Sequence, residues 1–311
     1  MSAGVAAIEY CLPSQSLSLP ELARAGLLTS SPEQLHEFGF GCCYISDVPA
    51  EALAARAAGQ LFSKNGVDPD SIDLLLYASA IAPGHHIAGE EFLTHFNYPA
   101  ARLQYELGLL HATSTGISQS GCMGLTNAVK LAADFLCANP GSERVLCVSA
   151  DVLPHGSSRE IMYNVISDGA CAVLVDRKSA RNRIVAHRAV TKGYYWDCVA
   201  RKQEIMAAYF PTAKNVIADV LSIAGWRAEE LRLILPHNVS LRSWEILLGL
   251  IATTKERLFF QNIARKGHVI AADNWINLKD ATDNRMLRPA DRVLMFNFGF
   301  GANWAATLIE H

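Results

Sequence analysis

The stretch TSTGISQSGCMGLTNAVKLAADFL, residues 113–136, decides the fold, because it sets one cysteine between glycines where a helix is about to start. Small and polar residues lead to Cys122, and an amphipathic run follows it. We therefore expect Cys122 at or near the N-terminus of a helix. The apolar positions of this run recur at the spacing of one helical face: Leu125, Ala128, Val129, Ala132 and Leu136.

A cysteine in that position has two interpretations. The exposed N–H groups and the positive end of the helix dipole favour a thiolate, which is the nucleophilic form. Gly121 and Gly124 would let a substrate come close to the backbone. A cysteine can equally serve as a small core residue, so nucleophile and core filler both stay open on placement alone.

Composition bounds the class of protein. Half of the 311 residues are hydrophobic, which is enough for a large core. The formal net charge is −3 with a pI near 6.4, and no basic block could follow a phosphate backbone, so we expect no nucleic-acid partner. Apolar runs such as ILLGLIA are shorter than the ~20 residues of a membrane span. We expect a cytoplasmic protein without a membrane partner.

The cysteines and histidines do not have the spacing of a metal site. The eight cysteines include no CxxC pair, and several lie in apolar runs such as VLCVSA, so we interpret them as small buried hydrophobic residues. The only adjacent histidines are His85 and His86, whose side chains diverge. The sequence therefore predicts no bound metal.

Strands and amphipathic helices alternate along the chain, which is typical of an α/β layered fold. One outline occurs twice, in residues 53–80 and 217–238: a helix, a glycine turn, a short helical step and a buried strand. A second pair of similar segments is SERVLCVSAD (142–151) and ADRVLMFNFG (290–299). Two repeats in matching order predict an ancient duplication.

The two predicted halves are residues 1–178 and 179–311. The seam lies in the polar stretch DRKSARNR, which follows an apolar strand. The crevice between two similar halves is where we expect the chemistry. Two histidines are candidates for it: His237 follows the buried strand LRLILP, and His268 follows Gly267 ahead of another predicted helix.

Four motifs together resemble one known family, and their order and spacing match it: SQSGCMG (118–124), DGA (168–170), PHNVSLR (236–242) and FGFGANW (298–304). Over nearly its whole length the chain resembles the β-ketoacyl-acyl carrier protein synthase III branch of the thiolase-fold enzymes. The resemblance implies an α/β thiolase fold whose two duplicated halves stack as α-β-α-β-α layers.

The resemblance also implies roles for single residues. Cys122 would be the nucleophile and His237 the catalytic histidine, while the backbone N–H groups of Cys122 and Phe300 would form the oxyanion hole. Tyr98 falls where the family places an aromatic residue that reaches across a dimer interface. The residues that the resemblance implies for substrate binding are Tyr98, Arg242, Gly299 and Gly301.

Two departures from the family pattern stand out. The segment GHVIAAD places His268 where GNTSAAS has its catalytic asparagine, so the predicted catalytic set is Cys122, His237 and His268. Glu33 and Glu37 lie near the positions of the tryptophan and arginine that usually contact coenzyme A. Lys266 and Arg159 are further candidates for phosphopantetheine or an acidic carrier protein, and Asp273 and Asn274 are interpreted as loop and capping residues.

The predicted reaction is acyl transfer through an acyl-cysteine, followed by decarboxylative condensation with a malonyl-type thioester. Two neutral imidazoles, those of His237 and His268, would share the enolate oxygen. Alternatives are transfer to an oxygen or nitrogen nucleophile, hydrolysis of the thioester, or a non-catalytic subunit in a heterodimer. The expected substrates are acyl-coenzyme A or acyl-phosphopantetheine on an acyl carrier protein, with no tightly bound cofactor and with a homodimer as the assembly.

Overall fold

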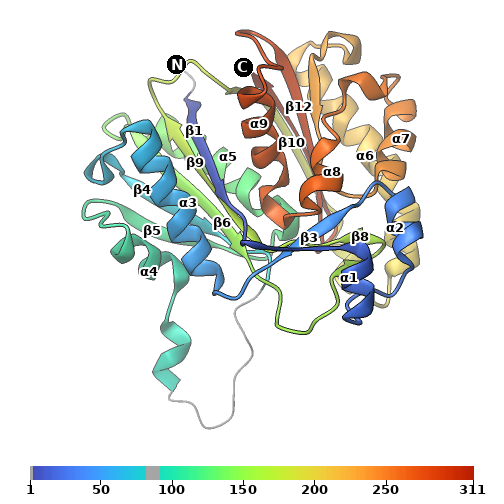
Figure 1. Cartoon of the computed structure of the whole chain (residues 1–311). Helices are drawn as coiled ribbons and strands as arrows, with labels where there is room; N and C mark the ends of the chain where they lie inside the picture. The colour runs from blue at the N-terminus through green and yellow to red at the C-terminus, as the bar shows by residue number, and fades with distance from the viewer. Residues whose placement is uncertain (1–2, 82–91) are drawn as a thin grey trace.

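The computed structural model describes residues 3–81 and 92–311, and its centre is a nine-stranded mixed sheet with helices on both faces (Figure 1). The strand order is β11-β12-β13-β10-β1-β9-β6-β4-β5. The strands are β1 (Gly4–Cys11), β4 (Leu74–Ala78), β5 (Thr113–Ile117), β6 (Arg144–Asp151), β9 (Gly169–Asp176), β10 (Arg183–Thr191), β11 (Leu233–Leu235), β12 (Arg292–Gly299) and β13 (Asn303–Glu310).

The sheet contains the same strand pattern twice. The series β1-β9-β6-β4 has the order and strand directions of β10-β13-β12-β11, with antiparallel pairs followed by one parallel pair. The two series meet between β1 and β10, where Gly4 pairs with Arg183. The predicted boundary after residue 178 falls in the loop between β9 and β10 and stays a prediction.

The helices of the two series occupy equivalent places, and both long outer helices end at a glycine. Gly66 after α3 and Gly225 after α6 have φ of 60° and 66°, a left-handed conformation that glycine adopts without a Cβ clash. These are the two glycine turns of the sequence repeat. The helices of the layers are α3 (Ala50–Asn65), α4 (Pro99–Glu106), α5 (Gly124–Ala138), α6 (Lys202–Ala224), α7 (Leu241–Leu250) and α9 (Asp273–Asp283).

Three hydrophobic clusters separate the layers. One lies between α3, α4 and the first strand series, and another lies between α6, α7 and the second. The third surrounds α5 and α9, which pack between the two series. Strand residues alternate between clusters: Leu74 and Leu76 of β4 face the central one, and Leu75 and Tyr77 face α3. The predicted α-β-α-β-α arrangement is confirmed.

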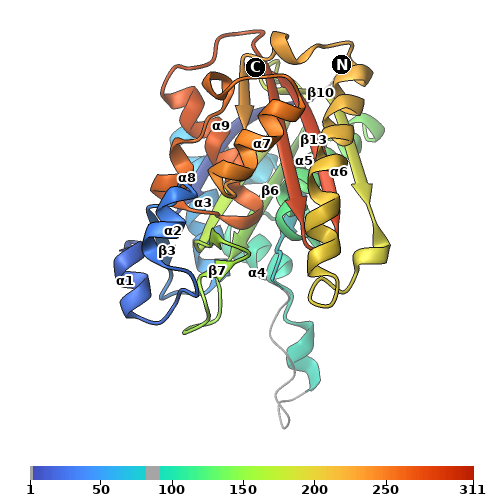
Figure 2. The ribbon, with the colours of Figure 1, turned by 90° about the vertical axis from the view of Figure 1, so that its right-hand side faces the viewer.

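Smaller elements cover the end of the sheet at which the central helices begin (Figure 2). The two-stranded antiparallel sheet of β2 and β3 crosses this end and lies beside α1, α2 and α8. The short elements at this end are β2 (Gln15–Ser18), α1 (Leu19–Arg24), α2 (Pro32–Glu37), β3 (Cys42–Ile45), β7 (Glu160–Ile161), β8 (Asn164–Val165), α8 (Gln261–Lys266), η3 (Gly121–Met123) and η7 (Ile270–Ala272). Further 3₁₀ helices connect the main elements: η1 (Pro69–Ser71), η4 (Gly193–Tyr195), η5 (Ala228–Glu230) and η6 (Lys255–Arg257).

A short arm precedes α4 and carries exposed apolar side chains. Its 3₁₀ helix η2 (Phe92–Phe96) lies away from the body of the molecule in both views (Figures 1 and 2). Leu93, Phe96 and Tyr98 are exposed, and the rings of Phe96 and Tyr98 meet edge to face at 6.2 Å. His85 and His86 lie outside the described residues. Within the described ranges no helix is long and apolar enough to cross a bilayer.

Candidate active site

Cys122 lies where sequence periodicity placed it, in the 3₁₀ turn η3 that leads directly into α5. The chain reaches it from β5 through Gln119 and Gly121, which have φ of 63° and 52°. This tight turn places Cys122 close to the end of β5, and the cysteine side chain is buried. The cysteine therefore lies at the start of the helix, as the sequence predicted.

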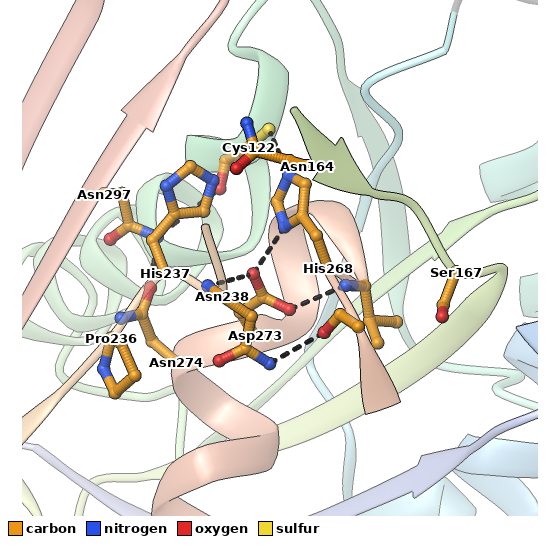
Figure 3. Close-up of polar contacts among 12 residues, drawn as sticks. Cys122, Asn164, Ser167, Pro236, His237, Asn238, His268, Asp273, Asn274 and Asn297 are labelled. Carbon is orange, nitrogen blue, oxygen red and sulfur yellow. Dashed lines mark hydrogen bonds and ion pairs between the residues drawn. The ribbon is translucent and has the colours of Figure 1, made fainter. Parts of the chain in front are cut away.

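His268 bridges the sulfur and a carboxylate. Its Nε2 lies 3.3 Å from Cys122 Sγ, and its Nδ1 lies 2.5 Å from Asp273 Oδ2 (Figure 3). The backbone fixes the ring, because His268 N–H donates to Val165 O and Ser167 N–H donates to His268 O. Gly267 before it has φ of 65°, and a Cβ there would meet Val165 O at 2.9 Å. The sequence thus needs glycine at 267 to set the histidine against the sulfur.

Asp273 is a functional candidate that sequence reasoning missed. It was interpreted as a loop or capping residue, but it is fully buried at the start of α9 and faces His268. Its Oδ1 accepts from Val269 N–H, and its Oδ2 accepts from Asn238 N–H. A carboxylate engaged by these donors acts as an acceptor, so His268 Nδ1 carries a proton toward it. The signal available in the sequence was an aspartate five residues after the histidine, at a helix start.

His237 completes the group from another segment, two residues after β11. Its ring lies edge to face with that of His268, with centroids 4.4 Å apart (Figure 3). The buried indole of Trp244 donates to the backbone oxygen of His237 and holds this turn in place. Neither ring nitrogen of His237 has a hydrogen-bond partner among the residues that the structure describes. The fold therefore brings together all three predicted catalytic residues, while their roles stay proposals.

The two imidazoles differ in charge. Burial opposes protonation of His268, but the charges of Asp273 and Cys122 outweigh it and raise the pKa of His268 to about 10. Burial, with a smaller contribution from the neighbouring His268, lowers the pKa of His237 well below 6.5. Near neutral pH the free protein therefore has one imidazolium held by a carboxylate and one neutral imidazole. The expectation of two neutral imidazoles concerns the acylated protein and stays a prediction.

The predicted oxyanion amides lie on two backbone segments in direct contact. A Cβ on Gly121 would lie 2.9 Å from Phe300 N, and a Cβ on Gly299 would lie 3.1 Å from Cys122 N. Only glycines allow so close an approach, so the backbone segments that carry the N–H groups of Cys122 and Phe300 are in contact. One segment comes from the start of α5 and the other from the turn between β12 and β13.

A cavity of about 190 Å³ opens in front of the sulfur, and a second of about 140 Å³ continues it toward α6. Their lining is mostly apolar, and they share Met162, Asn164, Val239 and Phe298. Cys122, His237, His268 and Phe300 all line the first cavity. An acyl chain would find an apolar path to the sulfur here.

The predicted substrate-binding residues lie in different places. Gly299 and Gly301 belong to the loop that supports the oxyanion amides and do not line either cavity. Arg242 is exposed on the first turn of α7, 3.4 Å from Glu245, and its neighbour Ser243 lines the second cavity. Tyr98 lies on the arm and lines neither cavity.

Two weaker candidates are corrected. Arg159 is buried, and its guanidinium lies 2.5 Å from the buried Asp168. Lys266 is also largely enclosed, and its ammonium lies 2.6 Å from Asp280. Both cations are neutralised inside the fold, so neither is available to a phosphopantetheine arm or to a carrier protein.

Relatives of known identity match this chain in sequence. Residues 221–311 match the model of the family described as 3-oxoacyl-[acyl-carrier-protein (ACP)] synthase III C terminal. The β-ketoacyl-[acyl-carrier-protein] synthase III of Aquifex aeolicus is 25% identical over 270 residues, covering 83% of each chain. The enzyme of the same name from Desulfotalea psychrophila is 22% identical over 288 residues, covering 84% of each.

Solved structures share the fold over the whole length. The synthase III of Aquifex aeolicus superposes with a TM-score of 0.84 at 22% identity, covering 99% of this chain and 100% of that one. An acyltransferase called ChlB3 superposes with a TM-score of 0.86 at 22% identity, covering 100% and 98%. The mixed sheet, the cysteine at the helix start, the C-terminal family match and these relatives make the chain similar to the β-ketoacyl-acyl carrier protein synthase III enzymes, with the thiolase fold.

Proposed function

We propose that this protein takes an acyl group from a thioester onto Cys122 and passes it to a hydroxyl or amine acceptor. One observation carries the proposal: His268 contacts Cys122 Sγ with Nε2 and Asp273 with Nδ1. A thiol, an imidazole and a carboxylate in this order form the arrangement that activates nucleophiles in acyl-transfer enzymes.

In the first half-reaction the thiolate of Cys122 attacks the thioester carbonyl. The developing oxyanion accepts hydrogen bonds from the N–H groups of Cys122 and Phe300, each donor contributing about 3 kcal/mol. The C–S bond of the donor then breaks, and the leaving thiolate takes the Nε2 proton of His268. The products are an acyl-cysteine, a free thiol and a neutral His268.

The tautomer left behind decides the second half-reaction. Asp273 keeps the proton of His268 on Nδ1, so the Nε2 lone pair faces the acyl-cysteine. This nitrogen is a base and not a donor. It takes the proton of an acceptor O–H or N–H, the acceptor attacks the acyl carbonyl, and Cys122 leaves again as the thiolate. The sum of both steps converts a thioester and an alcohol or amine into an ester or amide and a thiol.

Decarboxylative condensation, the reaction expected from the resemblance, is the second candidate. It requires donors to the enolate oxygen, and neutral His237 can provide one, because neither of its ring nitrogens is engaged. The curated relatives named β-ketoacyl-[acyl-carrier-protein] synthase III also favour it. His268 would have to remain an imidazolium through the step in order to supply a second donor.

The acyl donor is proposed to be acyl-coenzyme A or acyl-phosphopantetheine on a carrier protein, acting as substrate with no tightly bound cofactor. The apolar cavities support an acyl group next to the sulfur, and exposed Arg242 beside the second cavity could meet a phosphate at its mouth. A homodimer is proposed from the resemblance. The exposed apolar residues of the arm support it, and light scattering of the purified protein would measure it.

The test begins with a panel of acyl thioesters and intact-mass measurement. An acyl adduct that disappears in Cys122→Ala supports acyl-enzyme formation, rapid loss of the adduct to water indicates a thioesterase, and no adduct favours a non-catalytic subunit. The acylated protein is then divided between a pool of alcohols and amines and a malonyl-carrier protein. Ester or amide formation supports the proposal, whereas carbon dioxide release with a β-ketoacyl product supports condensation and refutes it.

A further inference from the structure

Three side chains of the metal-ligating kinds meet in the catalytic cavity. One ligand atom each from Cys122, His237 and His268 lies within 4.8 Å of the other two, and all three residues are buried (Figure 3). They come from widely separated segments, so no close spacing of ligands in the sequence indicates them.

The unsatisfied ring of His237 points to a ligand. Both of its nitrogens are buried and have no hydrogen-bond partner in residues 3–81 and 92–311, although leaving a buried polar group unpaired costs about 1–3 kcal/mol. Its ring nevertheless lies against that of His268, 4.4 Å away between centroids. The nitrogen lone pair of His237, which lies beside a second imidazole and a thiol, is therefore available to an electron-pair acceptor such as a metal ion.

His268 already has the outer partner that metal-ligating histidines have. Its Nδ1 donates to Asp273 Oδ2, which leaves Nε2 directed at the cavity, and Asp273 is anchored in turn by Val269 N–H and Asn238 N–H. Such a carboxylate–histidine pair fixes the tautomer and the orientation of a ligand ring and increases its basicity.

We propose that Cys122, His237 and His268 form a three-ligand site for a divalent ion of the zinc class, with the fourth position open to the cavity. Thiolate and imidazole donors select zinc-like ions over magnesium or calcium. In a tetrahedral zinc site the ligand atoms lie about 3.3–3.6 Å apart, given bonds of about 2.3 Å to sulfur and about 2.0 Å to nitrogen. The Cys122–His268 separation of 3.3 Å already matches, and His237 closes by side-chain movement.

Such an ion would act as a reversible block. It occupies the sulfur lone pair and the Nε2 position of His268, and the proton that these two groups share leaves to solvent. The loss of acyl transfer that follows rests on the proposed function, whereas the binding of the ion does not. A chelator or a competing thiol would restore the free nucleophile.

The experiment measures binding without any acyl substrate. Metal-free protein is titrated with Co²⁺ or Zn²⁺ alone, by calorimetry and by the absorption of tetrahedral cobalt with its thiolate charge-transfer band. We expect one equivalent per chain, loss of the band in Cys122→Ser, at least tenfold weaker binding in His237→Ala, and 10–100-fold weaker binding in Asp273→Asn. Cys137→Ser, which removes an exposed thiol, is the matched control and should bind as the wild type does.

A second measurement needs no variant. Zn²⁺ should protect Cys122 from iodoacetamide while Cys137 in the same sample still reacts, as followed by peptide mass. Equal metal binding in Cys122→Ser, or alkylation of Cys122 at an unchanged rate under saturating Zn²⁺, overturns the site. Acyl-adduct formation is measured separately in chelator-treated buffer, so failure of the metal site and failure of the proposed acyl transfer give different results.

Discussion

Replacing Asp273 with asparagine keeps the shape of the side chain but removes its negative charge. That charge holds His268 as an imidazolium beside Cys122, the proposed nucleophile. The carboxylate faces His268 Nδ1 at 2.5 Å and accepts from two backbone N–H groups. An amide can present only one oxygen to these three partners, so its NH₂ group faces either the imidazole or an N–H. We expect the His268 proton to move to Nε2, which destroys the base.

The size of the effect follows from the two histidines. The pKa of His268 is about 10 although burial opposes its charge, whereas equally enclosed His237, without a carboxylate, has a pKa well below 6.5. Without the imidazolium, the sulfur has no cationic partner, and a free thiol with a pKa of about 8.5 is only about 3% ionised near pH 7. Alkylation of Cys122 should therefore slow about 30-fold, and acyl transfer, which also loses its base, about 10²–10⁴-fold.

The assay follows iodoacetamide alkylation of Cys122 by peptide mass from about pH 6 to about pH 10, together with single-turnover acyl transfer. The difference between the wild type and Asp273→Asn should be large at neutral pH and should shrink as the pH approaches the His268 pKa of about 10, where the wild type loses its imidazolium. Asp280→Asn is the matched control, because it removes a carboxylate of the same helix that pairs with Lys266. An Asp273→Asn variant that is acylated and transfers at wild-type rates across this range would refute the role of the carboxylate.

Three further outcomes are expected. His237→Ala should still form the acyl-cysteine and transfer to an alcohol within about tenfold of wild type but lose any decarboxylation of malonyl thioesters; a loss of both would assign His237 to nucleophile activation. Gly299→Ala should slow acylation about 10²–10³-fold, because its Cβ would lie 2.6 Å from Ser120 O and would push apart the N–H groups proposed to bind the oxyanion. The control Gly59→Ala, whose Cβ would have no described atom within 4 Å, should leave the acylation rate unchanged. Arg159→Ala should lower the free energy of unfolding by about 3–5 kcal/mol in urea titration, since it leaves Asp168 buried and unpaired, and a change under 1 kcal/mol would show that the pair is not structural.

The layers of the fold could be predicted because they leave periodic traces in the chain. Helical spacing located α5 and put Cys122 at its start, and the repeated glycine turns marked Gly66 and Gly225 as equivalent helix ends. Motif order then placed His237 and His268 in one crevice. Helical spacing, glycine turns and motifs are each set by residues close together in the sequence. The periodic hydrophobic pattern therefore shows them directly.

The electrostatics of the site could not be predicted in the same way. Asp273 looked like a capping residue because nothing in its neighbours reveals that its carboxylate is turned inward against His268. Arg159 and Lys266 looked like surface cations because their partners, Asp168 and Asp280, are identified only by tertiary contacts. Only the tertiary structure shows which charges pair, even where the two partners lie near each other in the sequence. The pair of His268 with Asp273 gives the two histidines different charges.

The contact of Gly121 with the Gly299–Phe300 turn has a consequence for thermal behaviour. The N–H groups of Cys122 and Phe300 keep their relative position only while the two segments that carry them stay in contact. Each segment is connected to a different strand series. A separation of a few tenths of an ångström would misalign the donors while every layer of the molecule is still folded. On heating, acylation of Cys122 should therefore be lost some degrees below the unfolding temperature measured by circular dichroism.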